Sequence, residues 1–262
     1  MTGSDLQFFR GWFSEFCKNF HLKDRKEQLN ITLKEEHTLH VCENILAVAR
    51  GESLGADEML LAETIALFHD IGRFPQYAQY KTFKDSASVN HGLLGANTLL
   101  EQKVLDRLPA HEREIIMDSV KFHNAFAIAD IVDADKILFL KLIRDADKLD
   151  IWRVFLDFYE SPDEEKPEAI GLGFEDVPAY AGEILSHIRN MEIISLSRLK
   201  TLNDFKLLQL SWIFDLNFTA SFRLLIGRDY IRRIAATLPQ TDEIIDTVAL
   251  VNEFAREKSA NG

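Results

Sequence analysis

The spacing of apolar residues constrains this chain more than any other feature. Apolar positions recur every three or four residues along most of its 262 residues, and strand-like alternation is scarce. From Leu6, for example, the stripe continues through Phe9, Phe13 and Phe16. Because this period gives each helix one apolar face, we expect an all-α protein whose helices pack on a shared core.

The same pattern predicts the order of the helices. An N-terminal helix starts at a capping box over residues 4–7, and others follow over 32–49, 57–71, 89–105, 111–126 and 134–159, with a loop over 75–88. Residues 161–178 hold three of the six prolines, so we expect a loop over 161–182 between a first part, 1–160, and C-terminal helices, 183–262. The longest of these helices is predicted over 202–225. Its apolar character predicts that it packs back on the first part to form one compact domain.

The formal net charge of −12 narrows the possible partners. Broad nucleic-acid binding needs a basic face, so we exclude it, and an anionic membrane surface is disfavoured in the same way. No segment has the apolar length of a membrane span, and no signal peptide is recognisable, so we expect a cytoplasmic protein. Metals and a few local cations would still allow an acidic protein to bind a phosphorylated small molecule.

Histidines and aspartates stand in five separate segments, in contexts suited to binding a cation. They are His37, the pair His69–Asp70, His91, His123, and Asp145 or Asp147. Such ligands, without thiolates, suit Fe, Mn, Co, Ni, Zn or Mg. The sequence therefore predicts a site for one or two divalent metal ions.

The adjacent pair His69–Asp70 is the centre of this prediction. It follows a strongly apolar helix, where an uncompensated histidine and carboxylate would be costly to bury. A metal ion compensates both. Because neighbouring helical side chains diverge by roughly 100°, both reach one ion only at the helix end; alternatively, Asp70 lies between two ions.

The ordered set His37, then His69–Asp70, then Asp147 in Ala-Asp-Lys resembles the signature of the HD superfamily over residues 32–160. This resemblance implies a helical metal-dependent phosphohydrolase with those four residues as ligands. Asp145 is the alternative to Asp147, since helical residues two positions apart face roughly 160° apart and only one of them reaches the site.

Two further histidines extend the resemblance. HD proteins with two metals carry extra histidines in contexts similar to those of His91 and His123, which implies four histidines and two aspartates with Asp70 bridging the ions. Two ions would lower the pKa of a bridging water and stabilise charge on a phosphoryl group. In the alternative reading, His91 and His123 bond a substrate phosphate above a single ion.

Several polar residues are candidates for contacting the substrate. Arg73 and Lys148 lead this set, since either could engage a phosphate beside the catalytic Asp70. Polar residues in the apolar 202–225 stretch could form a pocket wall. The full set of predicted substrate contacts is Arg73, Lys121, Arg144, Lys148, Asp215 and Asn217.

The leading hypothesis for function is hydrolysis of a nucleotide or another small phosphate ester. Its rival is oxidative, because a few HD proteins with four histidines and two aspartates use two irons and dioxygen to cleave a C–C or C–P bond, as in myo-inositol oxygenase. A ligand-sensing protein with a vestigial site is the third hypothesis. A homo-oligomer is compatible with the sequence.

Overall fold

The computed structural model describes residues 1–128, 132–162 and 173–260. Within them the chain forms α-helices and short 3₁₀ helices, without a β-strand; Glu175 and Thr201 make an isolated bridge. The predicted all-α class is therefore confirmed. No helix in these ranges combines the length and the apolarity needed to span a membrane.

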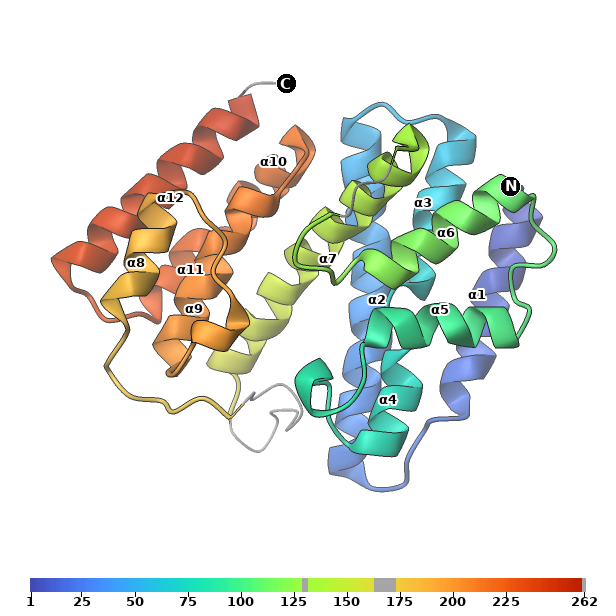
Figure 1. The fold of residues 1–262 in the computed structure, drawn as a ribbon, viewed down its shortest axis with the longest axis horizontal. Coiled ribbons are helices and arrows are strands. Elements are labelled where there is room, and N and C mark those ends of the chain that lie inside the picture. The colour runs from blue at the N-terminus through green and yellow to red at the C-terminus, as the bar shows by residue number, and fades with distance from the viewer. Residues whose placement is uncertain (129–131, 163–172, 261–262) are drawn as a thin grey trace.

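The first group of helices packs around α2. The α2 helix contacts both α3 and α7, while α5 and α6 pack against each other beside them (Figure 1). The elements of this group are α1 (Gly3–Lys18), α2 (Arg25–Gly51), α3 (Ala56–Phe68), α4 (Arg73–Tyr80), η1 (Asp85–Ala87), α5 (His91–Glu101), α6 (Ala110–Phe122) and α7 (Ala134–Glu160).

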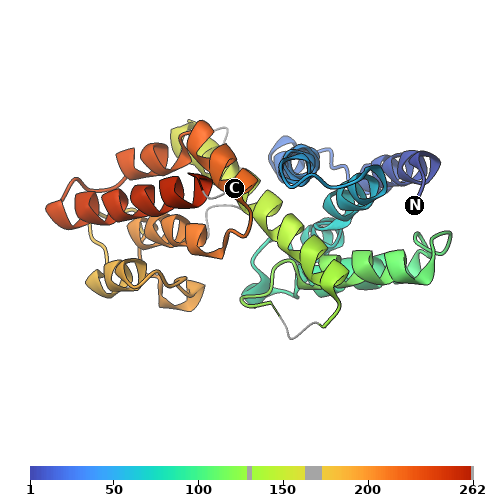
Figure 2. The same ribbon diagram turned by 90° about the horizontal axis from the view of Figure 1, so that it is seen from above.

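The second group begins on the last turns of α7. Figures 1 and 2 show α7 running out of the first group and into the second, where α10 and α11 pack on it. The elements of this group are α8 (Gly182–Arg189), η4 (Leu196–Arg198), α9 (Leu202–Ser211), η5 (Trp212–Asp215), α10 (Thr219–Gly227), α11 (Tyr230–Ala236) and α12 (Asp242–Ala260).

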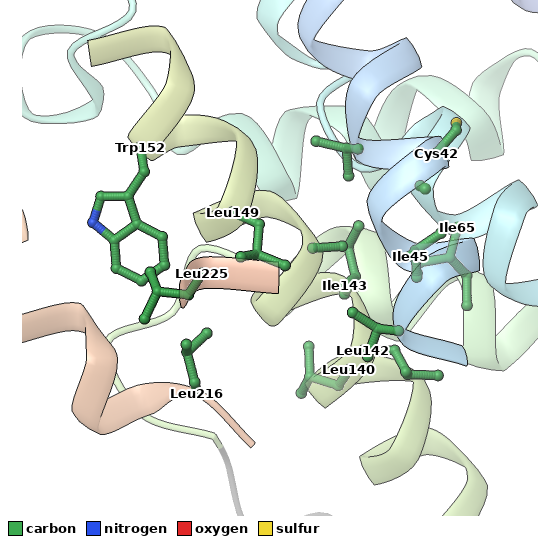
Figure 3. Packing of buried hydrophobic residues seen from close by; sticks show 14 of the residues in the cluster. Cys42, Ile45, Ile65, Leu140, Leu142, Ile143, Leu149, Trp152, Leu216 and Leu225 are labelled. Atoms are coloured by element: carbon green, nitrogen blue, oxygen red, sulfur yellow. The ribbon is translucent and has the colours of Figure 1, made fainter. Parts of the chain in front are cut away.

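The buried apolar residues form one hydrophobic cluster that extends through both groups. On one side of α7, Ile143 packs toward Ile45 of α2; further along the helix, Leu149 and Trp152 lie toward Leu225 of α10 (Figure 3). The α7 helix is thus the shared element of the core. This packing fixes the position of the C-terminal helices beside the first group.

Three predicted elements are wrong, and two of them lie in the first group. The 75–88 stretch is not all loop, because its first residues belong to α4. Pro75 falls in the first turn of that helix, where no intrahelical N–H is needed. The capping box of α1 is formed by Thr2 with Asp5 rather than by residues 4–7.

The single long helix predicted over 202–225 is also wrong: α9, η5 and α10 occupy this stretch, with an extended break before α10. The backbone N–H groups of Asn217 and Phe218 donate to the buried carboxylate of Asp145 on α7, 2.9 and 3.1 Å away. These hydrogen bonds to Asp145 take the place of the backbone hydrogen bonds that a helix continuing through residues 217 and 218 would form. The predicted 161–182 loop falls partly on residues 163–172, which lie outside the described residues.

Candidate metal centre

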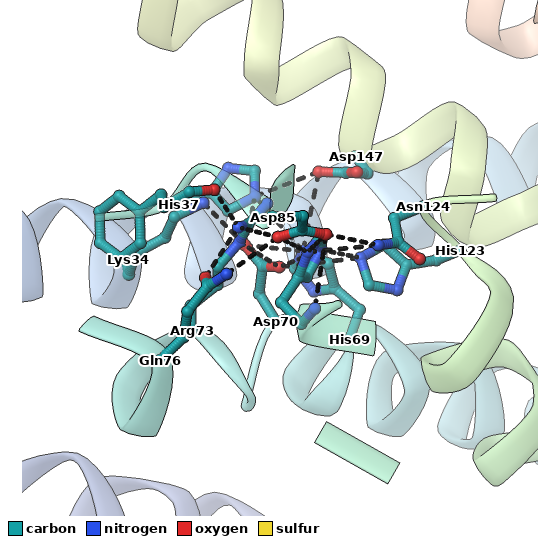
Figure 4. Close-up of polar contacts among 12 residues, drawn as sticks. Lys34, His37, His69, Asp70, Arg73, Gln76, Asp85, His123, Asn124 and Asp147 are labelled. Carbon is teal, nitrogen blue, oxygen red and sulfur yellow. Dashed lines mark hydrogen bonds and ion pairs between the residues drawn. The ribbon is translucent and has the colours of Figure 1, made fainter. Parts of the chain in front are cut away.

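Four histidines converge on Asp70 in the interior of the first group. His37 comes from the middle of α2, His69 follows the last residue of α3, His91 begins α5, and His123 follows α6. All four and Asp70 are buried, with at most 4% of their surface exposed. Figure 4 shows His37, His69 and His123 gathered around Asp70.

The two carboxylate oxygens of Asp70 face different histidines. Oδ2 lies 3.5 Å from Nε2 of His37 and 3.8 Å from Nε2 of His69. Oδ1 lies 3.3 Å from Nε2 of His91 and 3.7 Å from Nε2 of His123. Asp70 therefore stands between two half-sites, which we call the His37 side and the His91 side.

Asp147 of α7 completes the His37 side. Its Oδ1 lies 3.1 Å from Nε2 of His37 and 3.7 Å from Nε2 of His69. On the other side, the Nε2 atoms of His91 and His123 are 3.0 Å apart. The six side chains named from the sequence as metal ligands thus meet in one place. Besides Asp70, the His37 side holds His37, His69 and Asp147, and the His91 side holds His91 and His123.

The two histidines at helix ends are oriented by their own helices. Nδ1 of His69 donates to the carbonyl of Ala66 at 2.7 Å, and Nδ1 of His123 donates to the carbonyl of Val120 at 2.8 Å. Since a carbonyl only accepts, Nδ1 of each ring carries a proton. The lone pair of Nε2 is then directed at Asp70 and free to bind a cation.

The other two histidines are oriented by carboxylates. Nδ1 of His37 lies 2.7 Å from Oδ2 of Asp150, and Nδ1 of His91 lies 2.7 Å from Oδ2 of Asp85. Carboxylates in this position behind metal-binding histidines fix the ring and raise its basicity. Every histidine of the centre is therefore held through Nδ1 and presents Nε2.

Close packing at two glycines brings His91 to Asp70. A Cβ on Gly72 would lie only 2.6 Å from the backbone nitrogen of Gly95 and would also clash with the carbonyl of His91. The start of α5 can therefore approach the turn after Asp70 only because Gly72 has no side chain.

The charge of Asp70 is balanced by two cations in the protein. Nζ of Lys34 lies 2.8 Å from its Oδ2, and Nε of Arg73 lies 3.4 Å from its Oδ1. Burial alone would raise the pKa of this carboxyl, but Lys34, His69 and Arg73 hold the pKa well below its usual range. Asp70 is ionised and thus able to bind a cation with either oxygen.

His37 and His91, on opposite sides of Asp70, differ in the pKa of their imidazole groups. Burial opposes protonation of His37, but hydrogen bonds to Asp147 and Asp150 outweigh it and raise the pKa of His37 to about 9. Burial lowers the pKa of His91 to about 3, and Arg73 acts in the same direction. On the His37 side a proton therefore takes the place that a metal cation would take between His37 and Asp147.

The donor set fits divalent metal ions. His37, His69 and Asp70 offer ligand atoms within 4.8 Å of one another, and so do Asp70, His91 and His123. Imidazole nitrogens and carboxylate oxygens together suit Fe, Mn, Co, Ni and Zn. The residues present could hold one ion on each side of Asp70, or a single ion on the His37 side.

The comparisons with known proteins agree with this geometry. Residues 35–152 match the family model described as the HD domain, and this segment contains all six convergent side chains. The chain carries an HD domain. An HD domain suggests a member of a metal-dependent hydrolase superfamily. Neither the search of curated proteins nor that of solved structures finds a match.

Within the HD domain, Asp145 and Asp147 point to different places. Asp147 faces His37 (Figure 4), whereas the carboxylate of Asp145 accepts hydrogen bonds from Asn217 and Phe218. The two carboxylates therefore serve different structures: Asp147 belongs to the centre, and Asp145 ties the C-terminal group to α7.

A cleft of about 550 Å³ opens over the HD centre. It is lined by four of the predicted substrate contacts, Arg73, Arg144, Lys148 and Asp215. The other two lie elsewhere: the Lys121 ammonium stands over the ring of Phe122, 4.8 Å from its centroid, and the Asn217 amide donates to Asp145 at 2.8 Å.

Asp215 neutralises two cations of the cleft. Its Oδ2 accepts from Nη2 of Arg144 at 2.6 Å and lies 2.5 Å from Nζ of Lys148. Arg144 also donates to the carbonyls of His123 and Ala125, so it ties the end of α6 to α7. Lys148 has no such backbone bond among the described residues.

Three residues of the centre were not recognised as such from the sequence: Lys34, Asp85 and Asp150. Two of them had a signal, since Lys34 lies three residues before His37 and Asp150 three residues after Asp147, in each case on the same helical face. Asp85 had none, because it reaches His91 through the turn at η1, whose path the sequence does not specify.

Proposed function

We propose that this HD protein is a metal-dependent phosphohydrolase that cleaves a small phosphate ester, monoester or diester, with water as the nucleophile. The observation that carries the proposal is the position of Asp70, with each oxygen facing its own pair of histidines. This arrangement suits two ions that share one carboxylate. When bound, such ions would supply an activated water and neutralise charge on the phosphoryl oxygens.

The described lining of the cleft has five cationic side chains against four aspartates, a net charge of about +1 with neutral histidines, in a protein whose net charge is −12. Five cationic side chains line it: Lys34, Arg73, Lys84, Arg144 and Lys148. These charges favour an anionic ligand beside the centre. Lys148 is the cation best placed to contact it, since its Nζ is bound only to Asp215 among the described residues, and it lies next to Asp147 in the chain.

The lining of the cleft also supports water rather than a protein nucleophile. Ser86 is the one hydroxyl side chain among the described lining residues, and its surface position leaves it without a base. Both cysteines, Cys17 and Cys42, are buried outside the cleft. A covalent serine or cysteine mechanism therefore has no support in the lining.

The test is phosphate release by protein stripped of metal and reloaded separately with Mn²⁺, Fe²⁺, Co²⁺ or Zn²⁺. The substrates are a panel of nucleotides, sugar phosphates and simple alkyl or aryl phosphates. We expect release that requires metal and is lost in Asp147→Ala but kept in the control Lys121→Ala. Oxygen consumption by the ferrous protein without phosphate release would overturn the proposal in favour of the oxidative alternative. Ligand binding without any turnover would favour a sensor.

A further inference from the structure

The cleft changes character along α7. On one stripe of this helix Arg144, Asp147 and Lys148 line the cleft, followed by Ile151 and Phe155. With a helical rise of about 1.5 Å per residue, Ile151 and Phe155 stand about 6 and 12 Å along the axis from Asp147. The cleft thus has a charged half at the HD centre and an apolar half further along α7.

The second helical group supplies the opposite wall of the apolar half. The loop before α9 contributes Ile193 and Leu196, and the α9–η5 region contributes Phe205 and Trp212. Between residues 149 and 212, each described side chain that lines the cleft is apolar, and the indole N–H of Trp212 is the single polar group that these side chains offer.

These walls form a continuous surface with open apolar area. The rings of Phe155 and Phe205 meet edge to face with centroids 4.8 Å apart, and the ring of Trp212 lies next, 6.4 Å from that of Phe205. Leu196 keeps 46% of its surface exposed, and Ile151 is half-buried. A hydrocarbon group would cover this surface favourably. A sugar or another hydroxyl-rich group would lose its hydrogen bonds to water there with few replacements.

We propose that the substrate is an amphiphilic phosphate ester, whose phosphate lies beside Asp147 and Lys148 and whose alkyl or aryl body lies against the apolar wall. The inference rests on the proposed function for the phosphate end. The apolar end rests independently on Ile151, Phe155 and the wall opposite them. An apolar body that passes Ile151 and reaches Phe155 covers the apolar residues that α7 contributes to the cleft.

The test separates binding from turnover. Isothermal titration calorimetry on the Mn²⁺-loaded protein uses ethyl, butyl, hexyl and octyl phosphonate, which cannot be hydrolysed. We expect the dissociation constant to fall by about two- to fourfold for each added methylene until the chain passes Phe155. The inference is wrong if affinity is independent of chain length, or if nucleoside monophosphates and glucose phosphate bind more tightly than hexyl phosphonate.

Matched variants locate the effect. Ile151→Ser removes an apolar side chain from the wall, and Val154→Ser removes one from the same helix outside the cleft. Ile151→Ser should flatten the chain-length dependence, and Val154→Ser should retain it. Ile193→Ser, in the opposite loop, repeats the test without altering α7. Equal dependence in all three variants would overturn the inference.

Phosphate release from the matching alkyl phosphates distinguishes the two proposals. Chain-length-dependent phosphonate binding without release of phosphate contradicts the hydrolase and supports the apolar site. Release that is equally fast from ethyl and octyl phosphate, with no dependence of binding on chain length, supports the hydrolase and contradicts the apolar site.

Discussion

Replacing Asp145 tests whether Asp145 and Asp147 of α7 have separate roles, the first in stability and the second in metal binding. The carboxylate of Asp145 is fully buried and accepts from the backbone N–H groups of Asn217 and Phe218, as well as from the Asn217 amide. Asp145→Ala leaves both backbone groups unpaired at the start of α10. Asp147→Ala instead removes a carboxylate that faces His37.

The magnitude follows from the lost partners. An unpaired, fully buried N–H costs roughly 1–3 kcal/mol, and the N–H groups of Asn217 and Phe218 are only partly buried, so roughly 2–6 kcal/mol is an upper bound for the two. Burial raises the pKa of Asp145, although the hydrogen bonds from Asn217 act in the opposite direction, so the buried charge itself is unfavourable. Its removal in Asp145→Ala therefore offsets part of the free energy lost with the hydrogen bonds. We expect Asp145→Ala to lower the free energy of unfolding by roughly 2–4 kcal/mol, and Tm by roughly 5–15 °C.

The assay is urea unfolding of both variants after chelation of metal, paired with metal analysis of the folded proteins after reloading. Asp145→Ala should lose stability and keep its metal, while Asp147→Ala should lose the ion of the His37 side with a smaller change in stability. Asp145→Asn, which keeps one acceptor, should fall between Asp145→Ala and the unaltered protein. The reasoning is refuted if Asp145→Ala unfolds at the same urea concentration as the unaltered protein, or if it loses its metal while Asp147→Ala retains it.

Other perturbations address the centre and its cleft. Asp150→Ala frees Nδ1 of His37 and should weaken metal binding by about 10- to 100-fold; unchanged affinity in a competitive chelator titration would show that Asp150 does not position the ring. Metal at a hundred times its dissociation constant should stabilise the protein by about 2.7 kcal/mol. Scanning calorimetry before and after chelation measures this difference, and identical melting curves would argue against a bound ion. Lys148→Ala removes a charge-assisted contact worth roughly 1.5–3 kcal/mol and should raise KM for a phosphate ester about tenfold or more. The control Lys121→Ala should leave KM unchanged. Equal effects of the two substitutions on KM would contradict a role for Lys148 in binding the phosphate.

The six side chains that converge at the candidate centre could be named from the sequence because they stand in short local contexts. His69 follows a strongly apolar helix, His123 follows an amphipathic one, and His91 lies in a stretch where glycines permit close packing. Helical periodicity placed the ligand-bearing elements in order. The choice between Asp145 and Asp147 stayed open in the sequence, because it depends on the rotation of α7 against its neighbours.

Long-range contacts set the remaining features. Asp145 accepts a hydrogen bond from Asn217, which lies 72 positions later in the chain. The apolar pattern of residues 202–225 alone predicts a helix that continues through Asn217, so this contact could not be foreseen. Asp85 orients His91 from a turn whose path follows from tertiary packing. The apolar half of the cleft could not be predicted either, because Phe205 and Trp212 have the sequence spacing of ordinary core residues on a helix.

The central claim is that Asp70 is shared by two metal sites, and counting metal ions tests it most directly. We would measure Mn²⁺ per chain by inductively coupled plasma mass spectrometry after loading and desalting the unaltered protein, His91→Ala and Asp70→Ala. The proposal that two ions share Asp70 predicts two ions for the unaltered protein, one for His91→Ala, which loses the His91 side, and close to none for Asp70→Ala. Full metal content in Asp70→Ala would contradict the account.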